Sequence, residues 1–179
     1  MKSKGITAPA AMMFLLFLLL GGSLFSQVRP HHIFDNNMVL QRDQPVKIWG
    51  WANPSERVKI EFGGQVKSTS ANPQGEWLVY LDSMRANSNP QDLKISGKNN
   101  SVVFTNVLVG DIWILGGQSN MEMDLARLFH GDAETLSANF PNIRLMTIPS
   151  SAGQLPKKDF ERINEYDDWL DRHDKKGYW

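Results

Sequence analysis

Short runs of alternating apolar and polar residues, separated by turn-forming residues, fill the chain from Arg29 to Gly110. From Arg57 to Phe62 every second residue is apolar, which is the pattern of a strand with one buried face. Gly63-Gly64 follows as a two-residue hairpin signal. About seven strands in about 80 residues are typical of an antiparallel β-sandwich. The other strands are expected at Met38–Leu40, Val46–Trp51, Gln65–Ser70, Trp77–Leu81, Leu93–Ile95 and Val102–Val107.

The pattern changes after Gly110. Asp111–Leu115 is a continuous apolar run after one acid, which predicts a strand buried on both faces. Gly116-Gly117 ends this run, and helical spacing of apolar residues begins at Met121. A second helix is expected over Asp132–Asn139 and a second strand over Ile143–Ile148. This order of elements predicts a βαβ unit and a switch to parallel α/β architecture.

The last part of the chain has a different composition. From Lys157 to Lys176, charges of both signs surround single apolar residues such as Phe160 and Trp169. We expect a surface loop or an amphipathic segment that closes no core.

The first residues have the pattern of an export signal. Lys2 and Lys4 precede an apolar run over Ala10–Leu20, which Gly21-Gly22-Ser23 and a small residue at Ser26 follow. This arrangement predicts a secretory signal peptide over residues 1–27. The alternative is a membrane anchor, but a spanning helix needs about 20 apolar residues and this run is roughly half as long. The mature chain is therefore expected to be soluble and secreted or periplasmic, with no membrane contact after cleavage.

Composition excludes several function classes. The 179 residues contain 19 Lys and Arg, 19 Asp and Glu, and no Cys. A formal net charge of zero argues against nucleic-acid binding through bulk electrostatics. The absence of Cys excludes disulfides, thiolate zinc sites and a cysteine nucleophile.

The junction around Ser119 is the best candidate for a catalytic site. A serine hydroxyl becomes a good nucleophile only when a base removes its proton and donors stabilise the oxyanion. A sharp glycine turn at the carboxyl end of a buried strand would expose Ser119 at the start of a helix, where backbone N–H groups are free. The alternative interpretation is an ordinary strand-to-helix turn in which Ser119 caps the helix.

Several motifs resemble the sialate O-acetylesterase family, a branch of the SGNH hydrolases. The likeness covers roughly Pro30 to Ile148, with Gly116 as one departure from the family pattern. The motifs are Asp35-Asn36-Asn37-Met38-Val39-Leu40-Gln41-Arg42, Trp49-Gly50-Trp51-Ala52, Gly75-Glu76-Trp77, Val109-Gly110-Asp111-Ile112-Trp113, Gly117-Gln118-Ser119-Asn120-Met121-Glu122-Met123 and Asn142-Ile143-Arg144-Leu145.

This resemblance implies a serine esterase that acts on O-acetylated sugars, sialic acid or related ones. Ser119 would be the nucleophile, and its own N–H would be one oxyanion-hole donor. Gly117, Gln118 and Asn120 would support the turn and the oxyanion hole. The family uses a histidine as base, oriented by an aspartate, and the resemblance implies no metal or organic cofactor.

The histidine base cannot be assigned in this sequence. His31 and His32 precede the sandwich, where surface or packing roles are expected, and His130 lies about three helical turns from Ser119. Asp171-Arg172-His173 has the wrong spacing, because the family separates its acid and base by two residues and Leu170 stands where the acid would be.

Three hypotheses remain open from the sequence. The first is a carbohydrate O-acetylesterase built as a β-sandwich over residues 28–110, followed by the first βαβ unit of an SGNH-like parallel sheet over residues 111–179. A doubly wound sheet needs well over twice that many residues, so we expect the front portion of a longer, truncated enzyme. The second is a non-catalytic carbohydrate-binding sandwich, which requires an exposed platform from Trp49, Trp51 or Trp77. The third is a truncated product that does not fold stably.

Overall fold

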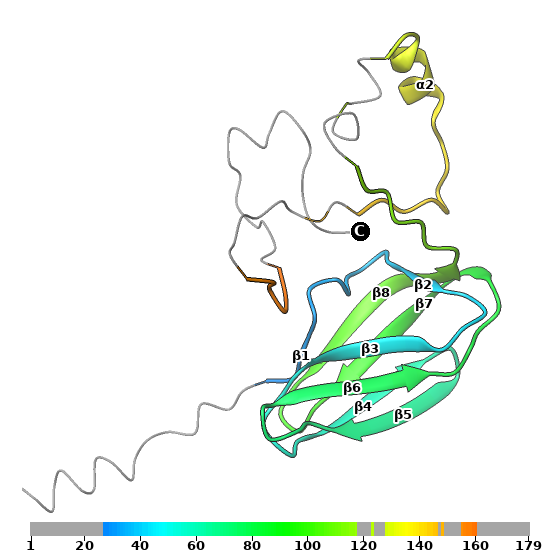
Figure 1. Ribbon diagram of the computed structural model, residues 1–179. Helices are drawn as coiled ribbons and strands as arrows, with labels where there is room; N and C mark the ends of the chain where they lie inside the picture. The colour runs from blue at the N-terminus through cyan, green and yellow to red at the C-terminus, as the bar shows by residue number, and fades with distance from the viewer. Residues whose placement is uncertain (1–26, 118–122, 124–127, 147, 149–154, 161–179) are drawn as a thin grey trace, which may run out of the picture.

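Two β-sheets form the body of the chain, and residues 111–117 lead away from them after the last strand (Figure 1). The computed structural model describes residues 27–117, 123, 128–146, 148 and 155–160. The elements are β1 (Arg29–Pro30), β2 (Val39–Gln41), β3 (Val46–Trp51), β4 (Arg57–Phe62), β5 (Gln65–Ser70), β6 (Glu76–Leu81), β7 (Asn87–Ser96), β8 (Ser101–Gly110) and the helix α2 (Gly131–Ser137).

Among the strands that the structure describes, the pairing is antiparallel with one exception. One sheet has the order β1-β3-β6 and the other has the order β2-β8-β7-β4-β5. Strand β2 pairs with β8 in parallel, from Val39 opposite Leu108 to Gln41 opposite Gly110. The predicted β-rich region is therefore confirmed as two sheets, and the fully antiparallel arrangement needs correction at this pair. Its partners lie far apart in the sequence, so local turn patterns gave no signal for it.

Strand β4 shows why the alternating pattern was informative. Val58 and Ile60 are completely buried and Phe62 nearly so, while Arg57 and Lys59 are exposed. The hairpin to β5 uses Gly63 and Gly64 at φ values of 57° and 77°. Both values lie in the left-handed region, which a two-residue hairpin turn of this kind requires and glycine adopts without strain. The predicted hairpin is confirmed.

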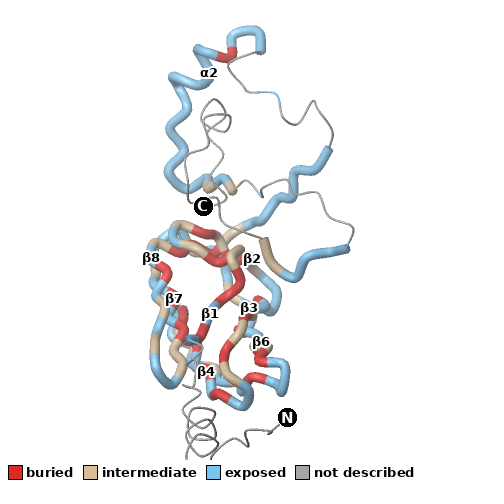
Figure 2. The backbone as a smooth tube through the Cα atoms, turned by 90° about the vertical axis from the view of Figure 1, so that its left-hand side faces the viewer, coloured by how far each residue is buried: buried red, intermediate tan, exposed pale blue. Residues whose placement is uncertain are grey.

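The core lies between the two sheets, where buried residues gather (Figure 2). Trp77 is 2% exposed and belongs to this core. The largest fully buried side chains in the described part of the chain are Val28, Met38, Ile48, Val58, Ile60, Leu81, Leu93, Ile95 and Val107.

A buried carboxylate joins two loops at one end of the sandwich. Glu56 accepts hydrogen bonds from the Lys98 N–H at 2.8 Å, the Asn53 N–H at 3.1 Å and the Asn53 side-chain amide at 2.8 Å. Burial disfavours its ionised form, but these hydrogen bonds outweigh that effect and lower the pKa of Glu56. The carboxylate therefore links the two loops through their N–H groups.

Replacing Glu56 by glutamine should lower the free energy of unfolding by about 1–3 kcal/mol at neutral pH. The reason is that N–H donors of Asn53 or Lys98 would then face the N–H₂ group of the new amide, which cannot accept a hydrogen bond. A carboxylate with a lowered pKa stabilises the fold above its ordinary value of 4.5, and this contribution is lost as the pH falls through the folded-state pKa. In denaturant titrations, the free energy of unfolding should fall less between pH 7 and pH 4 in Glu56→Gln than in the parent. Glu134→Gln, on the exposed surface of α2, is the matched control. Equal stability of both variants would contradict the role of Glu56.

The region after β8 departs from the sequence prediction. Residues 111–117 form no strand, and Trp113, Ile114 and Leu115 are 84%, 94% and 76% exposed. Among the described residues of 143–148 no strand forms either, so the two predicted strands are wrong there. A strand buried on both faces needs strands beside it and helices over it, and within the described stretches none lies next to 111–115.

The helix predicted over Asp132–Asn139 is confirmed as α2, which begins at Gly131 and lies away from the sandwich in both views (Figures 1 and 2). Most of the helix predicted from Met121 falls outside the described residues, and the described residues 123 and 128–130 are not helical. The SGNH-like βαβ arrangement is not confirmed, and the division of the chain at Gly110–Asp111 stays a prediction.

The signal peptide predicted over residues 1–27 also lies, apart from Gln27, outside the described residues. Within the part of the chain that is described, no helix is both long and apolar enough to span a membrane.

Candidate functional site

Only one of the four predicted site residues lies in the described part of the chain. Gly117 is exposed and follows directly on the segment that leaves β8. Gln118, Ser119 and Asn120 fall outside the described residues. The structure therefore shows how the sandwich holds the chain that leads to Ser119, and the predicted role of Ser119 stays a prediction.

Strand β2 fixes the point at which the chain leaves β8. The Arg42 N–H donates to the Gly110 carbonyl oxygen at 2.9 Å, which continues the parallel ladder by one more bond. The Gln41 side-chain oxygen then accepts the Ile112 N–H at 2.8 Å. Two consecutive residues of one motif thus hold the backbone on both sides of Asp111.

An ion pair strengthens the same point. Arg42 Nε lies 2.8 Å from Asp111 Oδ1, and Arg42 Nη1 lies 2.9 Å from Asp43 Oδ2. The hydrogen bond to Asp111 is the main reason that the pKa of Arg42 is raised. The side chains are about half exposed, so we assign this pair a positioning role and little stability.

A second contact set connects two of the motifs through strand β8. Asn36 Oδ1 accepts the Thr105 N–H at 2.8 Å, and the Asn106 amide donates to Asn37 Oδ1 at 2.6 Å. Arg144 Nη2 in turn donates to Asn106 Oδ1 at 3.2 Å. The motif over residues 35–42 therefore lies against β8, and the motif over residues 142–145 is tied to the same strand.

These contacts were missed by reasoning from the sequence. Gln41 and Arg42 were noted only as parts of a motif, without a role for either. The signal that could have found them is their place directly after a short apolar strand, where side chains can reach the end of a neighbouring strand.

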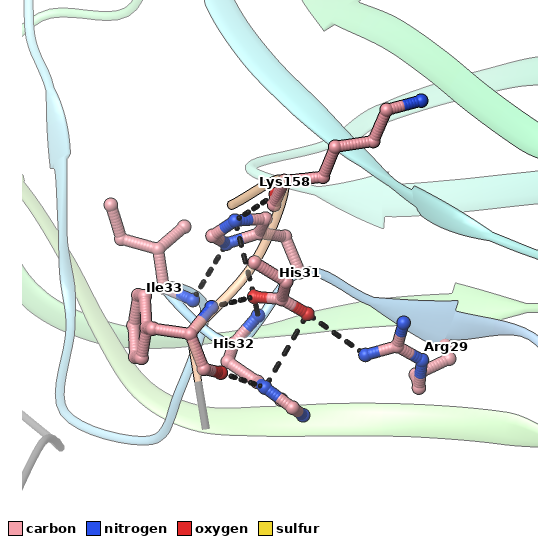
Figure 3. A network of polar contacts seen from close by, with 7 residues as sticks. Arg29, His31, His32, Ile33 and Lys158 are labelled. Carbon is pink, nitrogen blue, oxygen red and sulfur yellow. Dashed lines mark hydrogen bonds and ion pairs between the residues drawn. The ribbon is translucent and has the colours of Figure 1, made fainter. Parts of the chain in front are cut away.

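His31 and His32 pack where residues 158–160 contact the sandwich (Figure 3). His31 Nε2 lies 3.1 Å from the Lys158 carbonyl oxygen, and the Ile33 N–H donates to His31 Nδ1 at 3.0 Å. His32 Nδ1 lies 2.6 Å from the Phe160 carbonyl oxygen. The packing role expected for His31 is confirmed, since it is 9% exposed. Both of its ring nitrogens are already engaged, so it is not free to act as a base for Ser119.

The third described histidine, His130, is exposed and directly precedes α2 with φ of 61°. Residues 128–130, which directly precede this helix, form a bend and a turn. His173 falls outside them too.

None of the three sandwich tryptophans forms an open platform. Trp77 is buried, Trp49 packs against His31 and Phe34 with ring centroids 5.0 and 4.8 Å apart, and the Arg29 guanidinium covers Trp51 at 4.2 Å. Sugar-stacking sites need an exposed aromatic face. The carbohydrate-binding alternative, as built on these three residues, therefore loses its support.

Several known proteins that resemble this chain are named as acetylesterases. A sialate O-acetylesterase from Mus musculus is 32% identical over 126 residues, which is 64% of this chain and 23% of the mouse protein. The enzyme of the same name from Homo sapiens is 30% identical over 142 residues, covering 73% of this chain and 27% of the human one. The chain thus resembles the sialate O-acetylesterases at the family level. No protein-family model matches the chain.

The fold agrees with this resemblance to the sialate O-acetylesterases. A solved carbohydrate acetylesterase from Xanthomonas citri superimposes with a TM-score of 0.72 and 32% identity, covering 75% of this chain and 31% of that one. The likeness is partial, because the chain spans about a quarter of the length of the curated sialate O-acetylesterases that it matches, 23–27%.

Proposed function

We propose that this chain carries the nucleophile of a serine-type carbohydrate O-acetylesterase. The main support is the likeness in sequence and fold to proteins named sialate O-acetylesterase and carbohydrate acetylesterase. Further support comes from Gln41 and Arg42, which hold the start of the segment that leads to Ser119. The substrate class is an acetyl ester on sialic acid or a related sugar, and the protein is exported to the periplasm or the medium.

In the proposed reaction, Ser119 Oγ attacks the acetyl carbonyl carbon while a histidine takes the hydroxyl proton. The ester C–O bond breaks, and the sugar oxygen leaves with that proton. Water then attacks the acetyl-serine and releases acetate and free Ser119. The Ser119 N–H would stabilise the oxyanion, and Gly117, Gln118 and Asn120 would shape the turn that presents it.

The general base is proposed to be neither His31 nor His32. The ring nitrogens of His31 are both occupied, and His32 donates to the Phe160 carbonyl oxygen. Freeing either ring would break contacts between residues 158–160 and the sandwich. Because the sequence assigns this role to neither His130 nor His173, we expect the 179-residue chain by itself to lack an effective base.

The first test measures hydrolysis of an aryl acetate by the 179-residue chain and by Ser119→Ala. We expect no difference between the two rates, because a serine without a base gains little over water. Turnover that depends on Ser119 would show that a histidine of this chain does serve as base, and would overturn that part of the proposal.

The second test asks whether Ser119 works when a base is supplied. Residues 109–123 replace the aligned residues of the Xanthomonas citri carbohydrate acetylesterase, whose structure resembles this chain. The graft should retain hydrolysis, and Ser119→Ala within it should lower kcat by about 10³-fold or more. Met123→Leu in the same graft is the control and should keep the activity. A folded graft whose activity survives Ser119→Ala would exclude Ser119 as the nucleophile.

A further inference from the structure

The chain after β8 is held to the sandwich by polar and charged side chains. Asp111 pairs with the arginine that follows β2 at 2.8 Å, and Arg144 donates to β8 at 3.2 Å. Further along the chain, Lys158 and Asp159 form ion pairs with β6 and β1 at 2.6 and 2.8 Å. These contacts leave most of the large apolar side chains of the same part of the chain for another use.

Those apolar side chains are exposed. The first of them form a continuous apolar run over residues 112–115, in which Ile114 is 94% exposed. The other exposed large apolar side chains in the described residues that follow are Met123, Leu128, Phe129, Leu136, Phe140, Ile143, Leu145, Ile148 and Leu155. Apolar surface that is contiguous and left in water marks a site of contact with another polypeptide.

The backbone of the apolar run is free as well. The Ile112 N–H donates to Gln41 Oε1 at 2.8 Å, which fixes the start of the run beside β2. Within the described part of the chain, no hydrogen bond joins an N–H or C=O group of residues 113–115. A segment with apolar side chains on both faces and unpaired backbone groups along both sides fits between two strands of a covered sheet.

We propose that the apolar run is a docking surface for a β-sheet layer equivalent to the part of the Xanthomonas citri carbohydrate acetylesterase that this chain does not cover. The chain covers 31% of that protein with a similar fold, so the remaining part accompanies a fold like this one in a single molecule. Residues 112–117 carry no charged side chain, which requires an apolar partner surface. The inference rests on the proposed function, because the partner is taken from an acetylesterase.

Docking would also order the candidate catalytic segment. Ser119 follows Leu115, the last residue of the apolar run, by four residues. Arg42 and Gln41 already fix the start of the run, and strands on both sides of it would fix its end. The partner layer would therefore set the position of the turn that presents Ser119.

The test uses a chimera in which residues 28–148 of this chain replace the aligned residues of the Xanthomonas citri enzyme. Hydrogen exchange followed by mass spectrometry compares the amides of residues 113–115 in the chimera and in the 179-residue chain. We expect exchange in the chimera to be slower by about 10²-fold or more, because these amides become hydrogen-bonded within a sheet. Equal exchange in both proteins, or a chimera that does not fold, would overturn the proposal.

A charge in the middle of the apolar run tests the same contact independently. Ile114→Asp should leave the denaturant midpoint of the 179-residue chain unchanged, because this side chain is exposed there. In the chimera it should lower the midpoint and restore fast exchange, because a carboxylate would be buried without a partner. Val66→Asp, at an exposed apolar position of β5, is the matched control and should have little effect in either protein. Equal effects of the two substitutions in the chimera would also overturn the proposal.

Ser119→Ala in the chimera separates docking from the proposed function. It should abolish most hydrolysis of an aryl acetate and leave the slow exchange of residues 113–115 intact. A chimera with slow exchange but no hydrolysis that depends on Ser119 would support docking and contradict the proposed function alone.

Analytical ultracentrifugation of the 179-residue chain tests a different occupant, a second copy of the chain. We expect a monomer at micromolar concentration. A stable dimer that Ile114→Asp dissociates would assign the apolar run to the second copy and overturn the proposal.

Discussion

Replacing Gly50 by alanine should lower the free energy of unfolding by about 3 kcal/mol or more, the upper end of the range for overpacking. A Cβ at this position would lie 2.2 Å from the Arg29 carbonyl oxygen and 2.7 Å from Pro30 Cα. Both atoms belong to the backbone of β1, which cannot move aside as a flexible side chain could. The alanine would therefore push β1 away from β3 or disturb Trp77 in the core.

Guanidinium titrations of Gly50→Ala and Gly116→Ala would measure this effect. Gly116 is the matched control, because a Cβ there meets nothing within 4 Å. Its alanine variant should differ from the parent by less than about 0.5 kcal/mol. Because β1 carries Arg29, Gly50→Ala should also weaken the ion pair between Arg29 and Asp159 at neutral pH. Stability equal to that of Gly116→Ala would show that β1 does not pack as described.

Replacing Leu81 by alanine should cost about 2–5 kcal/mol. Leu81 is completely buried at the end of β6, opposite Val46 of β3. Removing its side chain loses the transfer free energy of the buried groups and leaves a cavity that the two sheets can fill only in part. The loss should appear as a lower denaturant midpoint with little change in slope.

Leu78 provides a control from the same strand. It has the same side chain but is 42% exposed, so Leu78→Ala should cost less than about 1 kcal/mol. The comparison holds strand, residue type and chain length constant and varies burial alone. Similar costs for the two variants would show that β6 does not present Leu81 to a packed core.

The strands with a strict alternation could be predicted from the sequence with the bounds that the structure has. This holds for β3, β4 and β5, where apolar spacing agrees with the hairpin chemistry of Gly63-Gly64. Strand β7 was only partly predicted, because Asn87–Asp92 is polar and its pairing with β8 contains register shifts. Backbone pairing without a hydrophobic pattern leaves little trace in a single sequence.

Other features depend on contacts between distant residues. The run over residues 111–115 has the composition of a buried strand, yet burial requires partners that composition does not supply. Asp159 lies in a stretch that was expected to be solvated, and its partners Arg29 and His32 are 130 and 127 residues earlier. The predicted site residues Gln118, Ser119 and Asn120 remain predictions that rest on family resemblance.

The parallel pairing of β2 with β8 has a consequence for the order of folding. Arg42 is synthesised 69 residues before its partner Asp111, and every strand from β3 to β8 is made in between. Contacts of such long sequence separation form late, because the loop between them must first be closed. During synthesis, the segment that leads to Ser119 can therefore find its anchor only after the whole sandwich has left the ribosome and β8 has paired. Slow-folding variants of the sandwich should consequently delay maturation of this segment even when their final stability is normal.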